Sequence, residues 1–353
     1  MTEIFLTIFF ISVLLFFLGS GIWVALSMIG VSAIGMMLFT SRPVGDAMAT
    51  TIWGTSSSWT LTALPLFVWM GEILFRTKLS ENLFKGLSPW MQKLPGGLIH
   101  VNIVGCALFA AISGSSAATV ATVGKMSIPE LRKRNYPEKI LLGSLAGSGT
   151  LGLLIPPSII LIIYGVAVQE SIAKLFIAGI IPGIMIAIIF MSYVIIWSLI
   201  NKKEMPKILE EYSFLEKVKR STQLLPVILL ILAVIGSIYT GVATATEAAS
   251  LGVVGALILS YFQKSLTLET FKSSLLGATK TSCMIAFILA GSTFLSLAMG
   301  FTGLPRNLAI WIQNMDLSPY VLIFVLMIFY IILGMFLDGI SAVVLTMAII
   351  EPM

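Results

Sequence analysis

The stretch Ser113–Leu131, SGSSAATVATVGKMSIPEL, decides the fold to expect, because it interrupts an apolar part of the chain with small and hydroxyl residues. Its first charged residue is Lys125. The flanking segments, GGLIHVNIVGCALFAAI and ILLGSLAGSGTLGLLIPPSIILIIYG, are apolar enough to enter a bilayer. A broken helix at that depth is tolerated only where protein buries it or where it lines a cavity. We therefore expect a break of the kind that forms binding sites in secondary transporters.

The composition places the chain among polytopic membrane proteins. Of its 353 residues, 58% are hydrophobic and only 10% are charged, whereas soluble domains carry about a quarter charged residues. We read the N-terminal segment 4–18 as a first membrane helix rather than a signal peptide. Cys106 and Cys283 lie in apolar runs and are interpreted as small hydrophobic residues. A single histidine, His100, predicts no histidine metal cluster, and we expect no cofactor and no nucleic-acid partner.

Ten apolar segments predict an all-α fold, since most are near the ~20 residues that span a bilayer. They lie at about 4–18, 22–39, 60–75, 97–131, 139–168, 175–200, 222–240, 243–262, 281–299 and 320–353. Three of them are broken, at 113–116, 147–157 and 338–341. The charged stretch 201–221 is predicted to be an amphipathic cytoplasmic linker between 1–200 and 222–353.

The two halves share short strings in the same order, which indicates an internal repeat. LSENLFKGLSPWMQ follows Gly71 and precedes the break at Gly114, and LPRNLAIWIQ follows Gly291 and precedes the break at Gly339. Both strings contain L-x-x-N-L and then W-x-Q. Repeats of this kind are typical of transporters. We expect residues 1–200 to hold scaffold helices, the hairpin 97–131 and the broken helix 139–168, and residues 222–353 to hold the hairpin 320–353.

The distribution of basic residues tests whether this repeat is inverted. Eighteen of the 21 lysines and arginines fall in the loops 76–93, 125–139, 202–220 and 264–280. Only Arg42, Lys174 and Arg306 remain for the other side. The positive-inside rule places the richer loops in the cytoplasm. The N-terminus is then periplasmic, and the two hairpins enter from opposite faces, as an inverted repeat requires.

The first break offers both kinds of ligand that ion-coupled transport needs. Gly114 permits a tight turn, and a helix that starts after Ser115 or Ser116 presents free N–H groups that suit an anion. The helix that ends at the tip presents free carbonyls, which suit Na⁺ together with the hydroxyls of Ser113 and Thr119. The alternative is that these small residues only allow close helix packing.

The second and third breaks carry further candidates. Gly147, Ser148, Gly149, Thr150 and Gly152 precede the pair Pro156-Pro157, and these residues predict an unwound stretch rather than a simple kink. In the third break, Asp338 is the only acid between 321 and 350. It either contributes to ion or gating chemistry or caps the helix that starts at Gly339 or Ile340.

Four motifs together resemble the large membrane subunit of TRAP (tripartite ATP-independent periplasmic) transporters. They are GSSAATVATVGKMSIPEL, LAGSGTLGLLIPPSIILIIYG, TATEAASLGVVGAL and GMFLDGISAVVLTMAI, and the resemblance covers nearly the whole chain. It implies an elevator-type secondary transporter in the bacterial inner membrane, with a periplasmic substrate-binding protein and a small four-helix membrane subunit as partners. It also implies Na⁺ as the coupling ion.

The resemblance and the residue types together give the expected sites. The expected ion ligands are Ser113, Ser115, Ser116, Thr119, Gly147, Gly149, Thr150, Asp338, Gly339 and Ser341. The expected substrate residues are Ser115, Ser116, Ser148, Pro156, Pro157 and Thr346. Family members look longer at the C-terminus, and no counterpart of the Pro156-Pro157 helix follows the second hairpin. We therefore expect a C-terminally truncated chain, the alternative being a form that lacks part of one ion site.

The function expected is Na⁺-coupled uptake of a small organic anion, such as a C4-dicarboxylate or a sugar acid, without enzymatic activity. One alternative is a two-hairpin ion or carboxylate transporter that works without a binding protein. The other is an intramembrane serine hydrolase that uses Ser115 or Ser116. It is disfavoured because His100 lies at the expected cytoplasmic edge and no catalytic base accompanies the serines.

Overall fold

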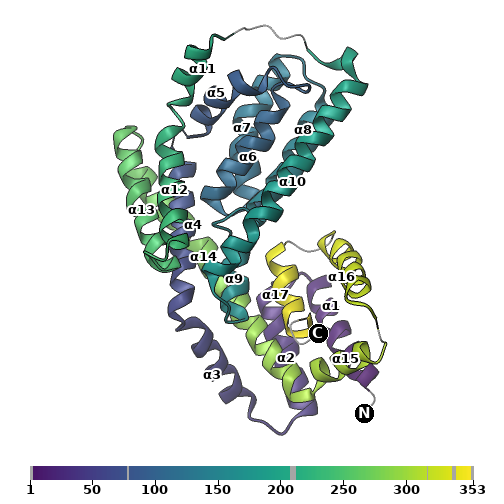
Figure 1. The fold of residues 1–353 in the computed structure, drawn as a ribbon. Helices are drawn as coiled ribbons and strands as arrows, with labels where there is room; N and C mark the ends of the chain where they lie inside the picture. Colours follow the sequence, from purple (N-terminus) through teal and green to yellow (C-terminus); the bar gives the residue numbers. More distant parts are fainter. Residues whose placement is uncertain (1–2, 78, 207–211, 316, 336–338, 351–353) are drawn as a thin grey trace. The chain divides into compact units, whose positions relative to one another are not determined.

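The computed structural model describes residues 3–77, 79–206, 212–315, 317–335 and 339–350, and every regular element in them is helical (Figure 1). Three of the described helices are long and apolar enough to cross a membrane, namely α10 (Ile172–Ile200), α13 (Ala245–Phe262) and α14 (Leu268–Thr302). Shorter apolar helices accompany them. Helices satisfy all backbone hydrogen bonds internally, which a bilayer interior requires. The chain is an all-α polytopic membrane protein, as its composition predicts.

The helices form two compact units. The first unit comprises residues 62–162 and 171–281, and the second comprises 1–61, 163–170 and 282–353 so far as they are described. Besides α10 and α13, the first unit contains α4 (Ala63–Phe75), α5 (Leu79–Met91), α6 (Ile99–Ser113), α7 (Ser116–Lys133), α8 (Glu138–Gly149), η2 (Thr150–Leu153), η3 (Lys202–Glu204), α11 (Phe214–Ser221) and α12 (Leu225–Tyr239). The second contains α1 (Glu3–Gly19), α2 (Val24–Phe39), α3 (Val44–Ser56), α15 (Leu304–Gln313), α16 (Pro319–Gly334) and α17 (Gly339–Ile350). The helices η1 (Trp59–Thr62), α9 (Ile159–Ala167) and α14 contribute residues to both units.

The core of the first unit lies where α6, α8, η2 and α10 meet. Ile99, Ile103, Leu151 and Val194 are buried together there, and Tyr136 packs against them. The helices α6, α7 and α8 lie side by side in Figure 1, and α4 packs along both α6 and α13. This packing holds the two arms of the first hairpin, α6 and α7, against the broken helix that follows them.

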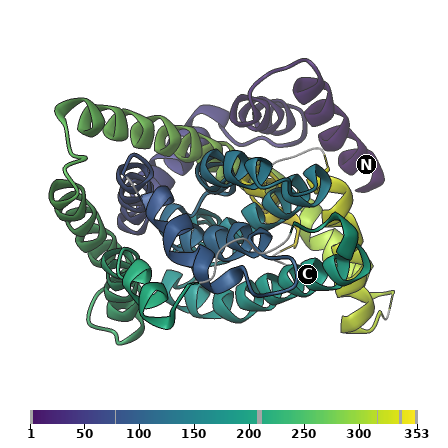
Figure 2. The same ribbon diagram turned by 90° about the horizontal axis from the view of Figure 1, so that it is seen from above.

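The second unit has a smaller core between α2 and α14. Met36, Phe294 and Ala298 are buried together there. Gly291 on α14 lies so close to α2 that a Cβ would stand 2.8 Å from the carbonyl oxygen of Ala25. The purple helices α1 and α2 lie side by side (Figures 1 and 2).

The recurring strings of the two halves fold alike. LSENLFKGLSPWM forms α5, and LPRNLAIWIQ forms α15. Each is a short helix on which apolar residues repeat at helical spacing and gather on one face, which is typical of helices at an apolar–polar boundary. The internal repeat stays a prediction, and the two compact units do not coincide with the predicted repeats 1–200 and 222–353.

Candidate functional site

The break in the first hairpin lies at the position that the sequence predicts. Helix α6 ends at Ser113, and Gly114 adopts a left-handed conformation with φ 58° while its N–H donates to the carbonyl of Ala110. Ser115 then caps α7, since its Oγ accepts a hydrogen bond from the N–H of Ala118 at 3.4 Å. Glycine adopts positive φ at little cost and commonly ends helices in this way. The residue types of Gly114 and Ser115 therefore determine where α6 ends and α7 begins.

Three neutral oxygens cluster at this tip. Thr119 Oγ1 donates to the carbonyl oxygen of Ser115 at 2.7 Å and lies 3.0 Å from Ser113 Oγ. Ser113 Oγ lies 3.4 Å from the same carbonyl oxygen. Ser113 and Thr119 are buried. The three oxygens are hydrogen-bonded to one another, and they are of the neutral type that could also coordinate a cation at a helix break.

The following membrane segment is also broken. Helix α8 ends at Gly149, one turn of 3₁₀ helix follows, and α9 begins at Ile159. Residues 154–158 between them are not helical, and the Pro156–Pro157 peptide bond is cis. Neither proline can donate a backbone hydrogen bond. The glycine run 147–152, which the sequence predicts to be unwound, instead forms the end of α8 and most of the 3₁₀ turn, and the non-helical residues begin only at 154 because the two prolines interrupt the hydrogen bonding there.

The structure brings the hairpin tip and the broken helix into direct contact. The N–H of Ile159 donates to the carbonyl of Gly114 at 3.3 Å. A Cβ at Gly114 would lie 2.7 Å from the carbonyl oxygen of Pro157, and one at Gly152 would lie 3.0 Å from the carbonyl carbon of Ser115. A side chain at Gly114 would clash with this carbonyl, and a side chain at Gly152 would require the backbone of Ser115 to shift. We call this contact between residues 113–119 and 149–159 the tip junction.

Helix α4 closes another side of the junction. A Cβ at Gly71 would lie 2.9 Å from Ser113 Cα, so α4 touches the backbone of the tip. Gly71 was not among the expected site residues, whereas Gly152 belongs to the glycine-rich candidate stretch of the second break. Gly152 belongs to the glycine run before the prolines, and Gly71 lies one short segment before the repeated string that starts at Leu79, so both positions carried a signal in the sequence.

The remaining predicted residues of the first unit lie around the junction rather than within its oxygen cluster. Ser148 is fully buried, and its Oγ donates to the carbonyl of Ser144 at 2.6 Å within α8. Thr150 is exposed, and its Oγ1 donates to the carbonyl of Gly147 at 2.7 Å. Ser116 is half-buried at the start of α7. Thr122, one turn beyond Thr119, has a buried Oγ1 without a hydrogen-bond partner among the described residues.

The second hairpin belongs to the other unit, and Asp338 lies outside the described residues. Gly339 begins α17, on which Ser341 and Thr346 are buried. The two arms are joined by a hydrogen bond between Tyr330 OH and Thr346 Oγ1 at 2.6 Å. Helix α14 supports this hairpin, since Ser292 Oγ donates to the carbonyl of Val344 at 2.6 Å. The first hairpin is supported in a comparable way by α4 at Gly71.

The arrangement does not form a serine–histidine pair. His100 lies in the first turn of α6, where its Nε2 is 2.7 Å from the carbonyl oxygen of Pro95. Ser115 follows the last turn of the same helix, and 15 residues of helix span about 22 Å. The sole histidine therefore cannot act as a base for Ser115 within this arrangement.

The turn between α7 and α8 carries the ion pairs of the expected cytoplasmic side. Arg132 and Glu138 form a hydrogen-bonded ion pair, and this pair holds the pKa of the Glu138 carboxyl below its ordinary value. Arg134 lies 3.8 Å from Glu130. Both pairs are at least partly exposed, so they contribute little to stability.

A broken-helix junction within an all-α membrane fold is typical of secondary transporters. A family model described as "Tripartite ATP-independent periplasmic transporter, DctM component" matches residues 9–353. The chain belongs to this family, whose members form the large membrane subunit of TRAP transporters. The family generally works with a small membrane subunit and a periplasmic binding protein. The resemblance inferred from the four motifs is confirmed.

Several curated relatives are similar over most of their length. A C4-dicarboxylate TRAP transporter large permease protein from Pseudomonas aeruginosa is 33% identical over 317 residues, covering 90% of this chain and 73% of that protein. A sialic acid TRAP transporter large permease protein from Vibrio cholerae is 31% identical, covering 94% and 77% respectively. A 2,3-diketo-L-gulonate TRAP transporter large permease protein from Escherichia coli is 30% identical, covering 87% and 72%.

Proposed function

We propose that this chain is the membrane subunit through which a small organic anion enters a bacterial cell, driven by a Na⁺ gradient. A periplasmic binding protein delivers the anion, and a small four-helix membrane subunit accompanies the chain in the inner membrane. The N-terminus is periplasmic, in agreement with the excess of lysine and arginine in the expected cytoplasmic loops. The first hairpin, the second hairpin and the broken helix move together against a scaffold, as an elevator.

The tip junction is the observation that carries this proposal. It joins a capped helix start at Ser115 to a stretch without helical hydrogen bonds at residues 154–158. The N-terminal N–H groups of α7 suit an anionic group. The hydroxyls of Ser113 and Thr119, with the carbonyl of Ser115, suit Na⁺. One junction therefore offers ligands for both the anion and the ion that drives it.

The substrate class follows from the relatives. Three of them transport a C4-dicarboxylate, sialic acid and 2,3-diketo-L-gulonate by name, and all three names denote organic acids. We extend this class to the present chain. No arginine lies between Ser113 and Leu131 or between 147 and 168, so the carboxylate is held by backbone N–H groups and hydroxyls in this part of the site.

Uptake into proteoliposomes tests the proposal. The chain is reconstituted with its small membrane subunit, and a radiolabelled organic acid is supplied on a matching binding protein. We expect uptake that rises with an inward Na⁺ gradient, disappears when choline replaces Na⁺, and is absent without the binding protein. A pH gradient at zero Na⁺ serves as the control. Undiminished uptake in choline without a proton gradient contradicts Na⁺ coupling, and uptake of free acid alone supports a transporter that needs no binding protein.

A further inference from the structure

A groove of about 580 Å³ lies in the first unit between α8 and α10, and its lining comes from α6, α8 and α10 alone. The volume is within the roughly 300–1,000 Å³ of ordinary ligand pockets. Most of the described residues that line it are apolar, and none of them is acidic. Helix α10 is long and apolar enough to cross a membrane. The groove therefore suits a ligand with an apolar body that comes from the bilayer.

The two walls of the groove run in opposite directions. A Cβ on Gly147, near the end of α8, would lie 3.5 Å from the ring of Phe190. Farther along the chain, Ile155 meets an earlier part of α10, since its side chain would lie 2.9 Å from a Cβ on Gly183. The start of α8 and the end of α10 therefore lie at the same end of the groove.

Three hydrogen-bond donors line the groove toward this end. They are Lys139 in the first turn of α8, Trp197 in the last turn of α10, and Tyr193 one turn before Trp197. In the part of the chain that the structure describes, their side chains have no hydrogen-bond or ion-pair partner. The neighbouring Glu138 is paired with Arg132 instead. This end thus offers the charge of Lys139 and two neutral donors to a ligand.

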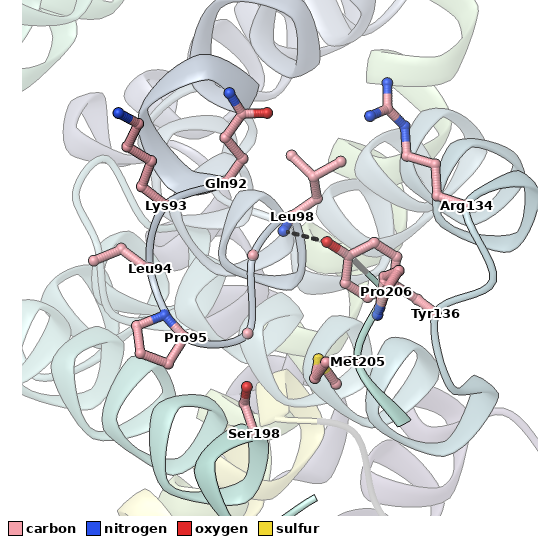
Figure 3. Close-up of a pocket in the computed structure, with 12 residues that line it drawn as sticks. Gln92, Lys93, Leu94, Pro95, Leu98, Arg134, Tyr136, Ser198, Met205 and Pro206 are labelled. Atoms are coloured by element: carbon pink, nitrogen blue, oxygen red, sulfur yellow. Dashed lines mark hydrogen bonds between the residues drawn. The ribbon is translucent and has the colours of Figure 1, made fainter. Parts of the chain in front are cut away.

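The segment before Lys139 is attached to the core of the first unit. Tyr136 accepts a hydrogen bond from the N–H of Leu98 at 3.0 Å (Figure 3). The ring of Tyr136 also packs against the buried cluster around Ile99. A preformed site loses less conformational entropy when it binds. The attachment therefore favours a defined site at the start of α8.

The rest of the groove is apolar and open. A Cβ on Gly143 would meet nothing within 4 Å, and one on Gly147 would make only an ordinary contact with Phe190. Ile103 of α6 is fully buried at the bottom of the groove, and Ile189 of α10 is exposed at its edge. The two glycines lie one turn apart on α8, so the groove has room for a flexible hydrocarbon chain there.

We propose that this groove holds one anionic phospholipid, with its phosphate next to Lys139 and Trp197 and an acyl chain along Gly143 and Gly147. The lining changes along the groove from a cation through a phenol hydroxyl at Tyr193 to apolar side chains, and a phospholipid changes from phosphate through ester to hydrocarbon in the same order.

Charge decides between a lipid and an apolar helix of another subunit as the occupant. A helix would leave the amine of Lys139 without a counter-charge, whereas a phosphate supplies one. Lys139 belongs to a loop that the positive-inside rule places in the cytoplasm. The cytoplasmic leaflet is also the one that is rich in anionic lipid. The proposal does not depend on the transported substrate.

Native mass spectrometry of the full chain, purified in an uncharged maltoside detergent, tests the site. Phosphatidylglycerol or phosphatidylcholine is added in increasing amounts, and the bound molecules are counted. We expect a first phosphatidylglycerol to bind at a lower concentration than further molecules and than phosphatidylcholine. Lys139→Gln should raise the concentration for its half-occupancy roughly tenfold, as expected for a lost hydrogen bond to a charged group. Gly143→Leu should weaken the first binding of both lipids, because the new side chain fills the groove.

Lys133→Gln is the matched control, since it removes one charge from an exposed residue that does not line the groove. It should bind phosphatidylglycerol like the wild type. Lys139→Gln should melt like the wild type in detergent alone, because the lysine has no protein partner to lose. Glycerol phosphate, which has no acyl chain, should not displace the lipid.

Four results would overturn the proposal. They are equal binding of the two lipids by the wild type, equal binding of phosphatidylglycerol by Lys139→Gln and Lys133→Gln, displacement of the lipid by glycerol phosphate, and unchanged lipid binding in Gly143→Leu. If Gly143→Leu keeps its lipid but separates from the small membrane subunit, the groove is a protein interface instead.

Discussion

Gly152 lies against the backbone of Ser115 so closely that a Cβ on Gly152 would stand 3.0 Å from the Ser115 carbonyl carbon. The contact joins the hairpin tip to the broken helix, two segments in which the helical hydrogen bonding is interrupted. The N–H of Ile159 also donates to the carbonyl of Gly114, so moving one segment away from the other would leave these two backbone groups unpaired, and the positions of the segments depend on each other. The first predictions concern this dependence.

The substitution Gly152→Ala should damage both folding and transport. The added methyl meets backbone atoms, and overpacking of this kind costs about 1–3 kcal/mol. Gly143→Ala on α8 is the matched control, because a Cβ there meets nothing within 4 Å. Alanine in a helix is favoured over glycine by about 1 kcal/mol, so the control should melt at the wild-type temperature or slightly above it. Equal melting temperatures and equal uptake for both variants would show that the contact is not tight.

The substitutions Ser113→Ala and Thr119→Val should raise the Na⁺ concentration for half-maximal uptake several-fold. Each removes one oxygen from the cluster at the tip while keeping most of the side-chain volume. Thr279→Val is the matched control, since the Thr279 hydroxyl is exposed and donates to a carbonyl four residues earlier, as that of Thr119 does. Uptake is measured against Na⁺ in proteoliposomes. An unchanged Na⁺ dependence in both cluster variants would place the ion elsewhere.

In the second hairpin, Tyr330→Phe should destabilise the pairing of α16 with α17. The variant loses the hydrogen bond to Thr346 Oγ1, which contributes about 1 kcal/mol. Tyr320→Phe makes the same change on the same helix, but Tyr320 is 84% exposed and should be neutral. Melting temperatures of the purified variants provide the comparison. A loss of stability in Tyr320→Phe as large as that in Tyr330→Phe would contradict the assignment.

The orientation of the chain is tested by labelling single cysteines after Cys106 and Cys283 are replaced. Cysteine at position 133, the last residue of α7, should react with an impermeant maleimide only after the membrane has been permeabilised. Cysteine at position 174, near the start of α10, should react in intact spheroplasts. The prediction follows from the distribution of basic residues. Labelling of position 133 from outside would reverse the proposed topology.

The sequence predicts the hairpin tip well because the signal there is local. A glycine that must adopt positive φ and a serine that caps the next helix are both readable from residue type. The contacts of Gly71 and Gly152 with the tip were not predicted, because they join segments that are far apart along the chain. Ser148 was expected to contact substrate, which stays a prediction, and the sequence did not indicate that its hydroxyl donates to the carbonyl of Ser144 within α8. Residue type alone does not show which way a helical hydroxyl points.

Helix α10 has a consequence for the surrounding lipid. Its 29 residues span about 44 Å, whereas the hydrocarbon layer of a bilayer is about 30 Å thick. Large apolar side chains such as Ile181 and Ile188 are exposed along it. A helix longer than the layer tilts, bends or thickens the membrane around it. A Cβ on Gly179 of α10 would lie 2.6 Å from the carbonyl oxygen of Leu154, and one on Gly183 would lie 2.9 Å from the side chain of Ile155. We therefore expect a tilt of α10 that follows a change of lipid chain length to shift the segment next to the prolines.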